Sequence, residues 1–217
     1  AGAARDTGAA GPSPAPLADT FKLHSRPSAT KVIYLDFNGH TTSGTYWNNG
    51  ATIVTPEYNV DGQTGFSNTE LTNIQDIWTR VVEDFSPFDV DVTTEEPVLE
   101  DLRKLGTGDT RWGIRVVVGV DSGSVAPGAG GVAYLTSFSW NSDTPCFVFP
   151  ERLGNDNKAI AEATSHEVGH TLGLSHDGRI SPSEGYYGGH GTGATGWAPI
   201  MGVGYYQPLV QWSKGEY

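Results

Sequence analysis

The segment from His166 to His176 constrains the fold more than any other, because its spacing requires a particular local geometry. His166 and His170 are four residues apart, and such residues share one face of an α-helix, so both imidazoles can point at one spot. Gly173 is suited to end this helix, because glycine adopts the left-handed conformation without a Cβ penalty. The turn then brings His176 back. The pattern predicts a helix with a three-histidine site at its end.

Three converging imidazoles are typical ligands of zinc, which binds histidine nitrogen at roughly 2.0–2.1 Å and is usually tetrahedral. Three protein ligands leave a fourth position for water, and zinc lowers the pKa of that water to about 7. Glu167 is the candidate general base, which takes a proton from the water and passes it to a leaving amine. These residues predict metal-assisted hydrolysis of an amide. Three of the six histidines of the chain lie in this short segment, which argues against a chance match.

The string HEVGHTLGLSH, residues 166–176, resembles the zinc-binding signature of the metzincin clan of zinc endopeptidases. The clan includes matrixins, serralysins, astacins and reprolysins, and it has a methionine in a tight turn beneath the zinc, the Met-turn. Here the single methionine, Met201, lies downstream of the third histidine. The resemblance implies that His166, His170 and His176 bind zinc, that Glu167 is catalytic and that Met201 forms the floor of the site.

The chain also departs from some families of the clan. Astacins and serralysins have a tyrosine two residues after the methionine, near the zinc, whereas this chain has Val203 there. Tyr205 and Tyr206 follow, and Tyr205 stays a candidate for stabilising the oxyanion, by analogy alone. Asp177 resembles the structural acid that follows the third histidine in reprolysins, and we expect it to anchor the segment after the helix.

Composition narrows the class of partner. The chain has 217 residues, of which 37% are hydrophobic and 18% charged, so we expect one globular domain with a substantial core. The formal net charge of -12 disfavours nucleic acid and anionic membrane surfaces, and the apolar runs are too short to span a bilayer. The acidic surplus leaves calcium open as a structural ion. Cys146 is the single cysteine, so no internal disulfide forms, and we expect a buried thiol.

Periodicity and turn signals predict a sheet with helices packed on it, an α+β or α/β-like fold. A capping-box pattern at Ser67–Glu70, followed by apolar residues at helical spacing, predicts a helix that ends before Pro87. The segment 40–66 is expected to be loop, and the strand at 88–94 to have one wet face. Strands are predicted at 31–37, 88–94, 112–120, 132–138 and 146–149, a short helix at 97–105, the histidine helix from Asn155 or Asp156 to Gly173, and a final helix at 208–216.

The metzincin resemblance implies a twisted, mostly parallel sheet with a backing helix, the zinc-site helix, and a small irregular C-terminal subdomain that contains the Met-turn. Residues 1–30 are expected to be a flexible leader or propeptide remnant, and 31–217 the catalytic domain, divided near 173 into upper and lower subdomains. The strand at 132–138 is a hypothesis for the edge that pairs with an extended substrate.

The expected activity is that of a secreted, monomeric zinc endopeptidase acting on protein or peptide substrates, with no nucleic-acid partner and no membrane insertion. Two alternatives stay open: a zinc amidase or deacetylase acting on a non-protein substrate, and a non-catalytic binding domain that keeps zinc for stability. Glu167 argues against the second alternative, because a purely structural site needs no base beside its ligand.

Overall fold

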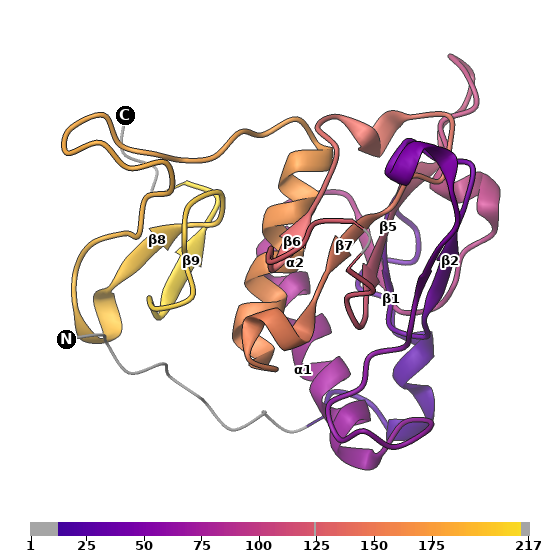
Figure 1. Ribbon diagram of the computed structural model, residues 1–217, viewed down its shortest axis with the longest axis horizontal. Helices are drawn as coiled ribbons and strands as arrows, with labels where there is room; N and C mark the ends of the chain where they lie inside the picture. Colours follow the sequence, from indigo (N-terminus) through magenta and orange to yellow (C-terminus); the bar gives the residue numbers. More distant parts are fainter. Residues whose placement is uncertain (1–12, 124, 214–217) are drawn as a thin grey trace.

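The computed structural model describes residues 13–123 and 125–213 (Figure 1). Its centre is a five-stranded sheet of order β4-β1-β5-β7-β6, in which β6 alone runs antiparallel to its neighbour. The fold is therefore mixed α/β with a mostly parallel sheet. The sheet consists of β1 (Lys31–Asp36), β4 (Asp91–Thr93), β5 (Trp112–Val118), β6 (Gly131–Val132) and β7 (Cys146–Val148).

The inner strands form where apolar runs are continuous, as expected for a parallel sheet covered on both faces. The predicted strands at 31–37, 112–120 and 146–149 are confirmed, each slightly shorter than expected. The predicted wet face of the strand at 88–94 is wrong, because all three residues of β4 are buried. Residues 23–25 cover its outer edge, where Ser25 N donates to Val92 O and Thr94 N donates to Leu23 O.

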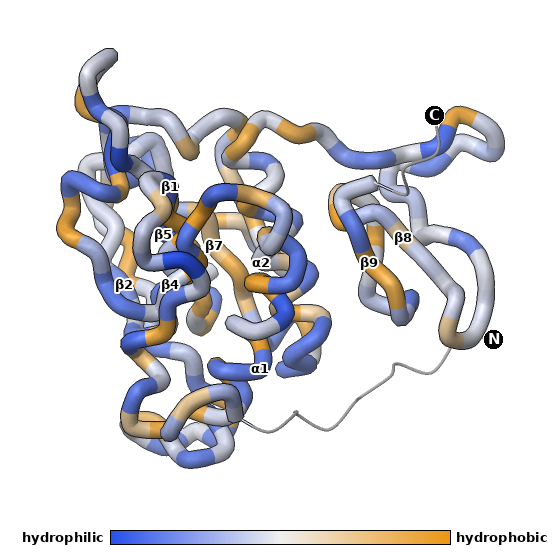
Figure 2. Tube along the Cα trace, turned by 180° about the vertical axis from the view of Figure 1, so that it is seen from behind, coloured by the Kyte–Doolittle hydropathy of each residue, from blue (hydrophilic) through white to orange (hydrophobic). Residues whose placement is uncertain are grey.

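Two helices cover one face of the sheet. In α1 (Asn68–Phe85) the predicted capping box is confirmed, since the Ser67 hydroxyl accepts from Glu70 N and the Glu70 carboxylate accepts from Ser67 N. In α2 (Asn157–Thr171) the Asp156 carboxylate caps the first turn by accepting from Ala159 N at 2.8 Å. In Figure 2 the hydrophobic residues are concentrated where β5 and β7 meet α2. Neither α-helix among the described residues is long and apolar enough to cross a bilayer.

The prediction that 40–66 is loop is wrong in part. A hairpin of β2 (His40–Thr42) and β3 (Ile53–Thr55) lies on the other face of the sheet, with the 3₁₀ turn η2 (Trp47–Gly50) between its strands. Trp47 and Ile53 are buried there against Phe147 of β7. These strands have only three residues each, so their alternation was too short to stand out from a Gly- and Asn-rich segment.

The strand predicted at 132–138 is also wrong beyond its first residue. The chain turns after β6, and Thr136 adopts a left-handed φ of 66° at the start of the 3₁₀ turn η4 (Ser137–Ser139). The Thr136 amide donates to the carbonyl of His170, and Phe138 enters the core, so the turn is held by α2. Leu135 is 52% exposed in this turn, and a substitution there does not probe strand pairing.

The C-terminal part is a small layer beside α2, on the side away from β2 (Figure 1). It contains the 3₁₀ turn η6 (Gly193–Thr195) and a two-stranded parallel sheet of β8 (Trp197–Pro199) and β9 (Leu209–Gln211). The final helix predicted at 208–216 is wrong where the structure describes it, because residues 209–211 pair with β8 instead. Residues 214–216 of that prediction lie outside the described residues.

The remaining 3₁₀ turns lie on the surface of the main layer. They are η1 (Leu17–Lys22), η3 (Leu99–Leu102), which falls within the short helix predicted at 97–105, and η5 (Pro150–Leu153). The described part of the N-terminal segment packs on α1, where the buried Gln75 donates to the Thr20 hydroxyl. The division at residue 30 and the division near 173 stay predictions.

Candidate metal centre

His166, His170 and His176 are brought together, as the spacing predicts. One ligand atom from each lies within 4.8 Å of the others, close enough to hold one metal ion, and His170 Nε2 is 2.9 Å from His176 Nε2. At tetrahedral zinc two nitrogens would be roughly 3.3 Å apart, given the usual bond length. The three rings therefore need little movement to bind one ion.

The end of α2 places the third ligand. Gly173 has φ of 97°, and its amide donates to the carbonyl of His170, while Leu174 N donates to Gly169 O. These bonds close the helix with a left-handed residue, as glycine allows. The predicted role of Gly173 is confirmed, and the reversal carries His176 back over the face that holds His166 and His170.

The outer nitrogens of two rings are also held. His166 Nδ1 is 2.8 Å from Ile200 O, and His170 Nδ1 is 2.8 Å from Leu174 O. A carbonyl only accepts, so each Nδ1 carries the proton and each Nε2 keeps its lone pair. Burial lowers the pKa of His166 to about 4, which keeps the ring neutral at ordinary pH. Neutral imidazoles fixed by carbonyls are the form that binds metal ions.

Glu167 faces the same cavity, which has a volume of about 470 Å³. Its side chain lies directly beneath Gly131 of β6, where a Cβ would come within 2.8 Å of the Glu167 carboxylate. Burial raises the pKa of Glu167 to about 8. The cavity is lined by the three histidines, Glu167, residues 129–133, Tyr186, Gly202, Val203 and Tyr205.

Met201 is buried beneath α2, one residue after the carbonyl that holds His166. A Cβ added at Gly169 would overlap the Met201 sulfur, so the thioether fills the space that this glycine leaves. Asp177 N donates to Met201 O at 2.8 Å, and the Asp177 carbonyl accepts from Tyr187 N. Asp177 thus joins the segment after the helix to Met201 through its backbone.

Two tyrosines line the cavity, and the sequence pointed to only one. Tyr205 is largely buried, and burial with the nearby Glu167 raises its pKa to about 12. Tyr186 has its ring centroid 4.1 Å from that of His176 and 6.2 Å from that of His166. Tyr186 was missed because it lies in a Gly-rich stretch without periodicity, and only the return of the chain after Gly173 brings it over the histidines.

Among the described residues the three histidines are the one group of three or more His, Cys, Asp or Glu side chains close enough to share a metal ion. A structural calcium ion stays a prediction.

Cys146 is buried, and burial raises the pKa of its thiol well above the usual value, as expected for an inert core residue.

No protein-family model matches the chain, and a search of the curated proteins found no match. The assignment of the site therefore depends on the chemistry and geometry of the residues that line it.

Proposed function

We propose that the protein is a secreted, monomeric zinc endopeptidase of the metzincin clan. The observation that carries this proposal is the convergence of the three histidines with Glu167 in one cavity beside the edge strand β6. The HEVGHTLGLSH string and the single methionine buried under α2 support the assignment to the clan.

Zinc fits the residues present. His166, His170 and His176 would hold it, and their outer nitrogens are already oriented by carbonyl groups, as is usual around metal-bound histidine. A bound zinc ion would supply an activated water and polarise the scissile carbonyl. Met201 would form the floor beneath the ligands by packing on Gly169.

Glu167 has the properties of the general base. Its side chain is buried and lines the cavity that the three histidines share. A carboxylate placed beside the hydrolytic water accepts a proton from it and then donates that proton to the leaving amine. This position in the cavity suits Glu167 to the cleavage of an amide bond.

The edge strand favours an extended peptide as the substrate. β6 pairs with β7 on one side, through Gly131 with Val148 and Val132 with Phe147. Among the described residues no strand pairs with its other side, and β6 lies along the cavity wall. An extended chain can add to such an edge by main-chain hydrogen bonds. This supports a peptide over the small non-protein substrates of an amidase or deacetylase.

The test compares the zinc-loaded protein with its Glu167→Gln variant on casein and on quenched fluorescent peptides. We expect the parent protein to cleave peptides and 1,10-phenanthroline to abolish this cleavage. In the variant kcat/KM should fall by about 10³-fold. The variant should still bind about one equivalent of zinc, like the parent. Cleavage that survives in Glu167→Gln, or active protein without zinc, would contradict the mechanism. Activity on amidase substrates but not on peptides would contradict the substrate class.

A further inference from the structure

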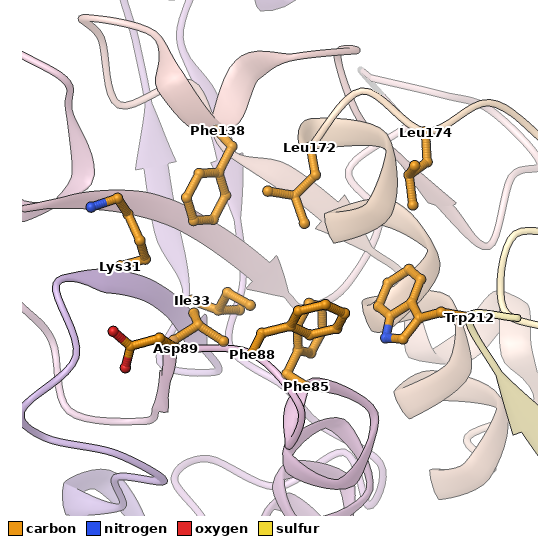
Figure 3. A pocket seen from close by; sticks show the side chains of 10 residues that line it. Lys31, Ile33, Phe85, Phe88, Asp89, Phe138, Leu172, Leu174 and Trp212 are labelled. Carbon is orange, nitrogen blue, oxygen red and sulfur yellow. The ribbon is translucent and has the colours of Figure 1, made fainter.

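A second cavity lies at the end of α2 and shares no lining residue with the metal cavity. Its volume is about 390 Å³, within the range of small-molecule sites. Figure 3 shows the aromatic and aliphatic side chains that converge on it from the sheet, the end of α1, the turn after α2 and the C-terminal segment. Its walls include Phe85, Phe88, Phe138, Leu172, Leu174 and Trp212.

The polar atoms of the lining residues are engaged elsewhere. Lys31 Nζ is 3.6 Å from the centroid of the Trp112 ring and donates to the carbonyl of Thr110. The carboxylate of Asp89 turns outward in Figure 3 and accepts from Arg26. Trp212 Nε1 donates to the carbonyl of Asp84 at 2.7 Å. A charged or strongly polar group placed in this cavity would lose its hydration without gaining a partner.

The mouth of the cavity is apolar as well. Phe88, Leu172 and Leu174 stand at it with 48%, 49% and 43% of their surfaces exposed. Covering exposed apolar carbon around a cavity with a ligand is favourable, because that surface is removed from water. The cavity therefore offers apolar contact on its walls and around its opening.

The same walls argue against a peptide as the occupant. Each peptide unit would bring an N–H and a C=O into the cavity, and each group buried there without a partner would lose its hydrogen bonds to water. A small molecule with few polar atoms avoids that cost. From the volume, the apolar walls and the engaged polar atoms, we propose that this cavity binds one uncharged, predominantly apolar small molecule.

The cavity wall also touches the turn that supports the metal centre. Leu172 and Leu174 flank Gly173, and the Leu174 carbonyl is the group that holds His170 Nδ1. An occupant in contact with both leucines would restrain this turn, and so stabilise the folded protein by binding it and not the unfolded chain.

The test uses the uncharged fluorophore N-phenyl-1-naphthylamine and the full-length protein loaded with zinc. We expect saturable binding of one dye per chain, with a rise in the melting temperature. Phe88→Asp places a carboxylate at the mouth and should weaken binding at least tenfold, whereas Phe88→Leu should retain it. Val54→Asp, at an exposed position on β3 outside the cavity, is the matched control and should bind like the parent.

Four results would overturn the proposal. The first is the absence of saturable binding by a folded parent protein. The second is equal binding by Phe88→Asp and Val54→Asp, which would place the dye elsewhere. The third is a dimer in sedimentation that Phe88→Asp converts to a monomer, which would show that a second copy of the chain covers the mouth. The charged analogue 1-anilinonaphthalene-8-sulfonate should bind at least tenfold more weakly than the uncharged dye, and equal affinity would contradict the proposed ligand class.

Discussion

Single residues determine the packing beneath the candidate metal centre. The position of Gly169 leaves no room for a Cβ, because Met201 occupies that space and the Trp212 ring lies 3.1 Å from the same point. Three segments distant in sequence therefore meet at one backbone position. A motif scan that treats this position as a spacer overlooks that contact.

Gly169→Ala should destabilise the protein by about 2 kcal/mol, because the added methyl group collides with a packed sulfur. At an exposed helix position the same change stabilises by about 0.5–1 kcal/mol. The sign of the change in stability therefore shows whether the added methyl group collides. Urea unfolding measures the free energy. In a Met201→Ala background the cost should largely disappear, and an unchanged cost there would show that Met201 is not the obstacle.

Asp84 makes stability depend on pH. Burial raises its pKa to about 7, and its carboxylate accepts from the Ser165 hydroxyl at 2.6 Å. In the unfolded chain this pKa is near its ordinary value of about 3.9. Between these two values the folded protein binds more protons than the unfolded chain, so the contribution of Asp84 is fully present below about 4 and is lost as the pH rises through about 7.

The variant Asp84→Asn should remove this dependence, since an amide accepts from Ser165 without ionising. Relative to the parent we expect it to be more stable at pH 8 by about 2 kcal/mol and to lose that advantage at pH 4. Thermal unfolding across this range tests it, and a difference independent of pH would rule out ionisation of Asp84 as the cause.

At the scale of elements, local signals predicted the structure well where they were strong. The capping box at Ser67 and the glycine stop at Gly173 were visible in sequence because cap chemistry acts within a few residues. The hairpin of β2 and β3 and the β8–β9 pair were not, and β6 is much shorter than the strand predicted at 132–138, because strands of two or three residues depend on partners far away in the chain. The sequence predicted a helix beginning at Pro208, whereas the residues after it form β9 by pairing with β8.

The turn at Gly173 can be tested for its role in placing His176. A Cβ there would meet only Thr136 at 3.5 Å, so Gly173→Ala strains the backbone without a collision. We expect a loss of about 1 kcal/mol in stability and weaker zinc binding, because His176 is displaced. Gly188→Ala is the control, since nothing lies within 4 Å of its added carbon. Equal zinc affinity in both variants would show that the left-handed turn at Gly173 is not needed to place His176.

At the scale of the molecule, the candidate metal centre joins two layers. His166 and His170 belong to α2 in the main layer, whereas Ile200, which holds the His166 ring, follows β8 in the C-terminal layer. The sequence predicted the convergence of the three histidines but not this connection, because no spacing rule relates residue 166 to a carbonyl at residue 200. The contact exists only once both layers are packed.

Removal of the metal should therefore loosen the C-terminal layer before the main one. With zinc chelated, we expect faster amide hydrogen exchange in β8 and β9 and a lower melting temperature, because binding to the folded state alone stabilises it. Amides of α1 are the internal control and should keep their protection. Uniform acceleration across α1 and β9 would contradict a local linkage.

The bond from His166 to Ile200 has a consequence for the order of synthesis. All three ligands emerge from the ribosome within eleven residues of one another, yet the carbonyl that orients the first is made twenty-four residues after the last. Met201, which supports the ligand helix from below, comes one residue later. A nascent or prematurely terminated chain that ends before residue 200 carries the three histidines and Glu167, but lacks the carbonyl that holds His166 and the methionine that packs on Gly169. If the proposed function holds, incomplete chains should therefore lack hydrolytic activity.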